Sequence, residues 1–137
     1  MLHERMSRIL VGSRLGSKQA EPIATAIKAA LEPLPQPMRR TVTFDNGTEF
    51  ARHYELNQAG IATYFCDPHA PWQKGGIENA IGRLRRRLPR KADLATLSPR
   101  ALGHLVETYN ATPRKCLAFL SPREVFSKAL NRVAPQP

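Results

Sequence analysis

The sequence is short of cysteine, of acidic residues and of long apolar runs. Its two cysteines, Cys66 and Cys116, lie far apart in 137 residues and form no CxxC pair, so neither a disulfide framework nor a zinc ribbon is expected. No stretch approaches the ~18 apolar residues of a membrane span, and no apolar secretory segment follows Met1. These absences predict a cytoplasmic protein with reduced thiols.

The shortage of acid leaves the chain strongly basic. Eleven Asp and Glu face 21 Lys and Arg, which gives a net charge of +10 and a pI near 10.5. Such an excess predicts a polyanionic partner, most often nucleic acid, bound with an affinity that falls as salt rises. A structural basic protein that binds RNA is one alternative. The length and the 42% hydrophobic content are those of one soluble globular domain.

Apolar periodicity and turn residues predict alternating strands and helices. Strands are expected at residues 9–15, 41–45 and 61–66, and helices at about 20–31, 48–60 and 77–88, followed by a helix capped by Ser98 and a short last helix begun by a capping box at 121–124. This order is typical of an α/β fold whose parallel strands are joined by crossovers.

The helix expected before Pro89 has an apolar face and a basic face. Its apolar residues recur at helical spacing and are Ile77, Ile81, Leu84 and Leu88. Arg83, Arg86 and Arg87 fall on the opposite side, which is either a solvated surface or a contact for DNA phosphates. Lys74, in the preceding loop, has the same two interpretations. Gly75 and Gly76 allow another group to approach the backbone closely.

Two acids stand where an α/β fold presents functional groups. Asp45 ends a predicted strand and Glu78 lies in the first turn of a predicted helix. Taken singly, Asp45 fits a tight turn and Glu78 fits the helix dipole. Together they could converge on Mg²⁺, because two bare carboxylates 4 Å apart would repel each other by about 4 kcal/mol at an effective dielectric of 20. Two such ions ~3.5–4 Å apart can drive phosphodiester chemistry.

Three stretches resemble the DDE transposases of the insertion-sequence-thirty group, within the retroviral-integrase-like superfamily. They are TFDNGTE at 43–49, FCDPHAPWQKGGIEN at 65–79 and NATPRKCLAFLSPREVF at 110–126. Asp45 and Glu78, 33 positions apart, match the second and third catalytic acids. The resemblance implies a ribonuclease-H-like catalytic core, two Mg²⁺ or Mn²⁺ ions in the complete enzyme, and cutting and joining of DNA at transposon ends.

The resemblance also implies features that this sequence does not match. Family members carry a first catalytic Asp on a strand ahead of the segment that matches Leu2–Leu15, and a helix-turn-helix before it. Glu4 is the nearest acid and matches a position outside the triad. We therefore expect the C-terminal part of a transposase, with a truncated core at 1–96, a helical extension at 97–130 and a flexible tail at 131–137.

Such a fragment is expected to be marginally stable, to have an open sheet edge and to be inactive alone. The alternative is a non-catalytic DNA-binding or dominant-negative partner of a full-length transposase. The fragment could pair with such a transposase, or it could self-associate. Two remaining patterns are weak. Cys66 and His69 lack a second ligand pair for zinc, and Trp72 is expected to anchor its loop rather than to stack on a base.

Overall fold

The computed structural model describes residues 1–13, 20–45 and 50–133. The chain forms two compact units, which we describe separately. The first unit consists of residues 1–14 and 76–132, and the second of residues 15–75 with 133–137. We call them the hairpin–helix unit and the parallel-strand unit. Within the described residues, no helix is long and apolar enough to cross a membrane.

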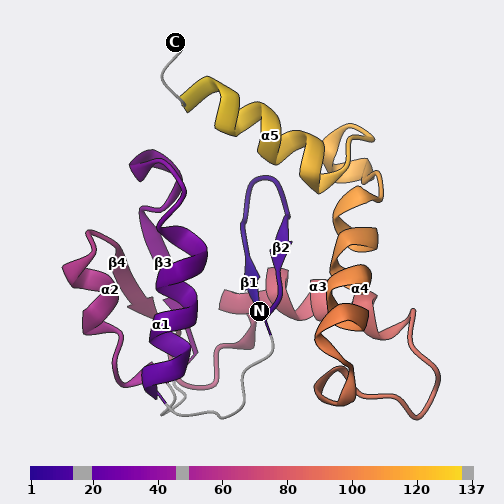
Figure 1. Ribbon diagram of the computed structural model, residues 1–137, viewed down its shortest axis with the longest axis horizontal. Coiled ribbons are helices and arrows are strands. Elements are labelled where there is room, and N and C mark those ends of the chain that lie inside the picture. Colours follow the sequence, from indigo (N-terminus) through magenta and orange to yellow (C-terminus); the bar gives the residue numbers. More distant parts are fainter. Residues whose placement is uncertain (14–19, 46–49, 134–137) are drawn as a thin grey trace. The chain divides into compact units, whose positions relative to one another are not determined.

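The parallel-strand unit is built on β3 (Thr41–Phe44) and β4 (Ala62–Phe65), which pair in parallel as expected. The amphipathic helix α1 (Ala20–Leu31) has the predicted bounds and buries Ile27. Figure 1 shows α1, β3, α2 and β4 together. Because parallel strands cannot be joined by a tight hairpin, the chain crosses between them through α2.

The connecting helix α2 (Tyr54–Gln58) is shorter than the expected helix at 48–60. Short-range turns precede it, with the His53 amide donating to the Phe50 carbonyl at 3.1 Å. The Phe50 ring packs 4.6 Å from the Phe44 ring, centre to centre, and this contact favours a tight turn over a regular helix. The chain leaves α2 through Gly60, whose φ of 82° suits glycine.

The hairpin–helix unit begins with β1 (Leu2–His3) and β2 (Leu10–Val11), which pair antiparallel. The strand expected at 9–15 is thus only two residues long in its described part, and residues 14–19 lie outside the description. The sequence patterns do not predict its partner strand, β1. The two strands run antiparallel because only the short turn at 4–9 connects them.

Three helices complete this unit: α3 (Gly75–Arg85), α4 (Pro99–Ala111) and α5 (Pro122–Val133). Helix α3 ends at Arg85, before the expected end at Leu88, and residues 86–87 form a turn, yet Leu88 still packs on the core. The Ser98 hydroxyl caps α4, and Ser121 and Glu124 form the predicted capping box of α5. Helix α5 continues three residues beyond the predicted end at Leu130.

The core of the hairpin–helix unit joins β2 to α3 and α4. One apolar face of α4 is buried, and α3 adds Ala80 besides the predicted Leu84. The cluster consists of Leu10, Ala80, Leu84, Leu102, Leu105, Val106 and Tyr109. By ordinary transfer energies, each large side chain buried here stabilises the fold by about 1.5–3 kcal/mol.

The buried side chain of Asn110 binds the free edge of β2. Its Oδ1 accepts from the Leu10 amide and its Nδ2 donates to the Leu10 carbonyl, both at 2.9 Å. Among the residues that the structure describes, β2 pairs with a strand, β1, on one side only. The Asn110 carboxamide satisfies backbone groups on the other side that a neighbouring strand would otherwise bond. A residue 100 positions away in sequence therefore fixes the hairpin against α4.

The Glu4 carboxylate organises the turn between β1 and β2. It accepts hydrogen bonds from the amides of Met6 at 2.9 Å and Ser7 at 2.7 Å, and from the Ser7 hydroxyl. Burial alone raises the pKa of this carboxyl, but these hydrogen bonds outweigh burial, so the pKa of Glu4 lies below its ordinary value. The ionised form therefore belongs to the folded turn.

Of the two glycines at the start of α3, Gly76 is the one with another residue packed closely against it. A Cβ on Gly76 would lie 3.1 Å from Cε1 and 3.2 Å from Nδ1 of His3, whereas a Cβ on Gly75 would meet nothing within 4 Å. The predicted close approach thus holds for Gly76 alone, and its partner is the His3 ring of β1.

We predict that Asn110→Ala lowers the free energy of unfolding by about 2–4 kcal/mol, because it leaves a buried amide and a buried carbonyl without partners. Urea denaturation measures the change. Asn131→Ala, at an exposed position of α5, is the matched control and should change stability by less than about 0.5 kcal/mol. Equal losses in both variants would contradict the role of Asn110.

We predict that Glu4→Gln lowers stability at pH 7 by about 1 kcal/mol, since the turn loses a charged acceptor. A carboxyl whose pKa is lowered by folding stabilises the protein above its unfolded pKa, and this contribution disappears as pH falls through the folded value. The variant and the parent should therefore converge below the ordinary pKa of 4.5. Thermal melts from pH 3 to 8 test this, with the exposed Glu32→Gln as control; a pH-independent difference would count against it.

Gly75→Ala and Gly76→Ala form a matched pair. Alanine favours a helix over glycine by about 0.5–1 kcal/mol, so Gly75→Ala should be neutral or stabilising. Gly76→Ala should be less stable than Gly75→Ala by about 1 kcal/mol or more, because its methyl group presses on His3. Urea denaturation of both variants measures the difference in their free energies of unfolding. Equal stabilities would show that the His3 ring moves aside at no cost.

Candidate functional site

Asp45 lies directly after β3, at the carboxyl end of the parallel pair. The carbonyl of the buried Phe44 accepts a hydrogen bond from the Cys66 amide at 2.8 Å, which carries the pairing to the point where Asp45 follows. The Phe44 and Phe65 rings pack 5.7 Å apart, centre to centre. Asp45 is half-buried. The expected turn at Asn46-Gly47 lies outside the described residues.

Glu78 lies in the first turn of α3, as predicted, and its side chain is exposed. Helix α3 is held in the hairpin–helix unit by Ala80 and Leu84, so the position of Glu78 follows from that core. Asp45 belongs to the parallel-strand unit. Each unit therefore presents one of the two predicted carboxylates, Glu78 on a helix and Asp45 directly after a strand.

The chemistry of these two side chains suits a hard divalent cation. Magnesium prefers oxygen ligands and is commonly held by one or two carboxylates together with water and substrate phosphate. Among the residues that the structure describes, no group of three or more His, Cys, Asp or Glu side chains forms a further metal cluster. Cys66 is buried and His69 is exposed, and the two do not form part of such a cluster.

A polar pair closes the loop that leads to α3. The Gln73 carboxamide accepts from the Asp67 amide at 2.7 Å and donates to the Asp67 carboxylate at 3.0 Å. Trp72, by contrast, is 75% exposed. The prediction that Trp72 anchors this loop is wrong, because Asp67 and Gln73 close it and the indole lies in solvent. No pattern in the sequence marks this pair in advance.

The predicted basic face of α3 is exposed. Arg83, Arg86 and Arg87 all lie on the surface, and Arg87 Nη2 is 3.4 Å from Oγ1 of Thr112. Lys74 ends the 3₁₀ turn Pro71–Lys74 immediately before α3. Arg83 is thus on the exposed side of α3 that the periodicity predicts, whereas Arg86 and Arg87 lie in the turn after the helix ends at Arg85.

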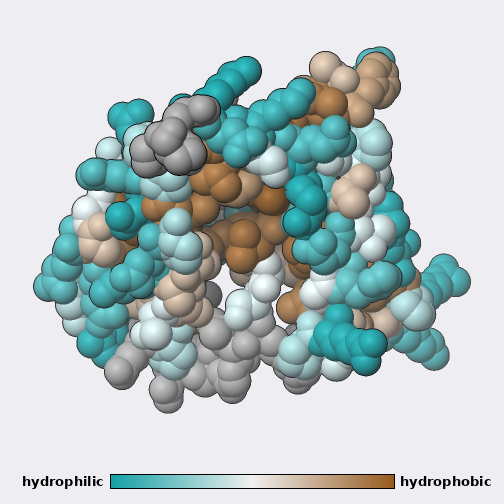
Figure 2. Space-filling model, turned by 45° about the horizontal axis from the view of Figure 1, so that its top comes forward, coloured by the Kyte–Doolittle hydropathy of each residue, from teal (hydrophilic) through white to brown (hydrophobic). Residues whose placement is uncertain are grey.

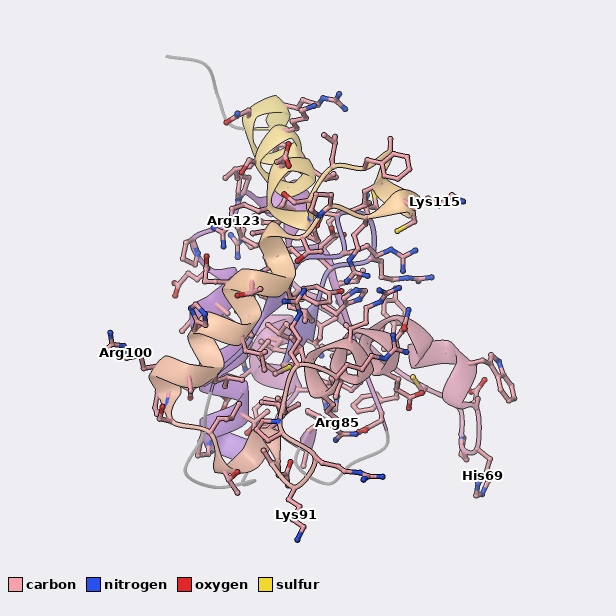
Figure 3. All side chains as sticks on the ribbon, turned by 90° about the vertical axis from the view of Figure 1, so that its right-hand side faces the viewer. His69, Arg85, Lys91, Arg100, Lys115 and Arg123 are labelled. Carbon is pink, nitrogen blue, oxygen red and sulfur yellow. The ribbon has the colours of Figure 1, made fainter. Side chains whose placement is uncertain are left out.

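Positive charge is also spread around the rest of the hairpin–helix unit. Figure 3 shows Lys91, Arg100 and Lys115 pointing outward on different sides. Arg123 instead pairs with Glu107 at 2.6 Å. Figure 2 shows hydrophilic side chains over much of the periphery of the visible face, as the net charge of +10 leads one to expect.

Two rings of the hairpin–helix unit, those of His3 and Tyr109, lie near several arginines. The sequence patterns do not predict this grouping. Burial lowers the pKa of His3, and Arg8, Arg114 and Arg5 lower it further, while Glu4 opposes them. Burial raises the pKa of Tyr109, against the influence of Arg114 and other guanidinium groups. The one available signal was Arg114-Lys115 in the third family-like stretch.

Comparisons with known proteins identify relatives along almost the whole chain. The transposase for insertion sequence element IS1086 of Cupriavidus metallidurans is 40% identical over 131 residues, which are 95% of this chain and 39% of that protein. Transposase InsI for insertion sequence element IS30A of Escherichia coli is 35% identical over 94% of this chain and 34% of its own length. The transposase for insertion sequence element IS4351 of Bacteroides fragilis is 34% identical over 87% and 36%. No family model matches the chain.

Among solved structures, the catalytic core domain of BIV integrase matches 95% of this chain and 85% of its own, with a TM-score of 0.71 and 20% sequence identity. This likeness confirms the expected ribonuclease-H-like fold. The chain spans between 34% and 39% of the length of the three transposases. It is therefore a homologue of IS30 and other insertion-sequence transposases, with the fold of an integrase catalytic core.

Proposed function

We propose that this chain forms part of a catalytic core for DNA transposition and integration, in which Asp45 and Glu78 hold Mg²⁺ or Mn²⁺. The observation that carries the proposal is the 40% identity with a transposase along 95% of the chain. Two positions support it. Asp45 follows a parallel strand at its carboxyl end, and Glu78 lies exposed on a helix whose core contacts fix it.

In this proposal each carboxylate contributes oxygen ligands from a rigid element. Bound divalent ions would supply Lewis-acid activation of a water or a 3′-hydroxyl for attack on a DNA phosphodiester. The protein positions its ligands by packing: the buried Phe44 directly precedes Asp45, and the buried Leu84 holds α3, the helix that carries Glu78. Two carboxylates are few for two ions, and the family's first Asp matches no residue of this sequence, so we propose that the chain alone does not carry out strand transfer.

Lys74, Arg83, Arg86 and Arg87 contact DNA phosphates in this proposal. Arg83 is exposed on α3, the helix that carries Glu78, and Arg86 and Arg87 are exposed in the turn that follows the end of α3 at Arg85. Contacts of this kind fix the register of a nucleic acid without reading its sequence. Self-association, or pairing with a full-length transposase, belongs to the same proposal, as does a place on the nucleoid, where the DNA is.

We predict that Asp45→Asn and Glu78→Gln each weaken Mn²⁺ binding by the 137-residue chain at least tenfold, because each removes a charged oxygen ligand. Titration followed by electron paramagnetic resonance of free Mn²⁺ measures the affinity without requiring catalysis. Glu32→Gln and Asp93→Asn, both at exposed positions, make the same chemical changes elsewhere and should bind Mn²⁺ as the parent does. Equal affinities in all five proteins would refute the assignment.

The same chain should give no strand transfer in Mg²⁺ or Mn²⁺ on DNA that carries the terminal repeats of a related element. Strand transfer that depends on Asp45 would show instead that two of the family acids suffice.

A further inference from the structure

Four arginines of the hairpin–helix unit lie around His3 and Tyr109. Arg83 already has a role in the function proposed above, and the other three have none. Arg5 and Arg8 come from the turn between β1 and β2, Arg83 from α3, and Arg114 from the loop after α4. We call them the arginine cluster. Arg8 and Arg114 each act on both His3 and Tyr109, Arg5 acts on His3 and Arg83 on Tyr109. Segments more than 100 residues apart in sequence thus place positive charge around the same two rings.

Arg114 is held in one position. Its amide donates to the Leu120 carbonyl at 3.0 Å, and its carbonyl accepts from the Phe119 amide at 2.8 Å. Its guanidinium carbon lies 4.4 Å from the centre of the buried Tyr109 ring. Nη2 of Arg114 is buried and has no hydrogen-bond partner within the described part of the chain. A fixed cation with an unused donor needs an explanation, because buried polar groups are nearly always bonded.

Arg8 lies against the start of α3. Its Nη1 is 3.9 Å from the position that a Cβ on Gly76 would occupy. Gly76 precedes Glu78 by two residues, and Arg83 follows Gly76 by seven, which returns to the same face of the helix about 10 Å further along. The cluster therefore extends from the turn that carries Glu78 along one face of α3.

The cluster lacks acidic partners. Throughout residues 1–13 and 76–133, none of its four guanidinium groups forms an ion pair with a carboxylate. Glu4 is the acid nearest to His3 in this set, and the amides and hydroxyl of the turn already occupy its carboxylate. Four cations around one such carboxylate, none of them ion-paired with it, create a positive potential that attracts anions.

We propose that the arginine cluster binds the phosphate backbone of a DNA strand beside the turn that carries Glu78. Guanidinium groups present paired donors that match phosphate oxygens, and they lose less hydration than an ammonium group would. A phosphate would relieve the repulsion among the four cations. The identity of the polyanion as DNA rests on the proposed function, whereas the anion site rests on the geometry of the cluster.

The test is DNA binding by the full 137-residue chain, measured by fluorescence anisotropy of a labelled duplex over a range of salt. Arg8→Gln with Arg114→Gln should weaken binding at least tenfold at 100 mM salt. It should also reduce the slope of log K against log salt by about 1.8, since each phosphate contact contributes about 0.9. The matched control is Arg90→Gln with Arg100→Gln, which removes two exposed arginines elsewhere. Equal weakening in both double variants would overturn the proposal, because bulk charge would explain it.

A second double variant guards against an effect through folding. Arg5→Gln with Arg8→Gln leaves the Arg114–Tyr109 contact in place and should bind DNA at least fivefold more weakly than the control, with an unchanged Tm. Loss of binding only when Arg114 is replaced would overturn the proposal, since the loss would then trace to the packing of Arg114.

Thermal unfolding with inorganic phosphate separates this proposal from the function on which it rests. Phosphate should raise the Tm of the parent above its value in chloride of equal ionic strength, and Arg8→Gln with Arg114→Gln should abolish that rise. If the parent shows the rise but binds no DNA, the anion site stands and the DNA function fails. If the parent binds DNA and both cluster variants bind as the control does, the cluster fails and the DNA function stands. If the parent responds to neither ligand, both fail.

Discussion

The paired hydrogen bonds between Asn110 and Leu10 are the interaction on which the hairpin–helix unit depends. A two-residue strand has too few ladder bonds to be stable alone, and β2 has a strand partner on one side only in the described part of the chain. The Asn110 carboxamide supplies both a donor and an acceptor at the other edge, inside the core, at 2.9 Å. Leu10 can then pack on α4, and the fixed hairpin can in turn support α3, which contacts it at Gly76.

The position of α3 follows from that support. His3 of the hairpin lies so close to Gly76 that a side chain there would collide with its ring, while Ala80 and Leu84 bury the next turns. Glu78 projects from the remaining surface. The other carboxylate has a different support, because Asp45 depends on the end of a parallel strand pair and on the aromatic packing around Phe44.

Several of the few acidic side chains are already engaged in hydrogen bonds or ion pairs within the fold. Glu4 is occupied in a turn, Glu124 caps α5 and Glu107 pairs with Arg123. Within residues 1–13 and 76–133, the arginines around His3 and Tyr109 form no ion pair with a carboxylate. A basic protein can tolerate such a grouping at its surface, where water screens the charges, and a polyanion bound there would find donors already oriented.

The sequence alone determined the features that depend on local periodicity and local bonding. These are helices α1 and α4, the parallel strands β3 and β4, the caps at Ser98 and Ser121, the exposed side of α3, and the positions of Asp45 and Glu78. Only the tertiary structure decided the antiparallel hairpin, the Asn110–Leu10 bonds, the shortened α2 and the exposure of Trp72. It also decided which arginines surround His3 and Tyr109, because Arg8 and Arg114 influence both rings only once α4 packs against the hairpin. No spacing in the sequence encodes a contact across a hundred residues.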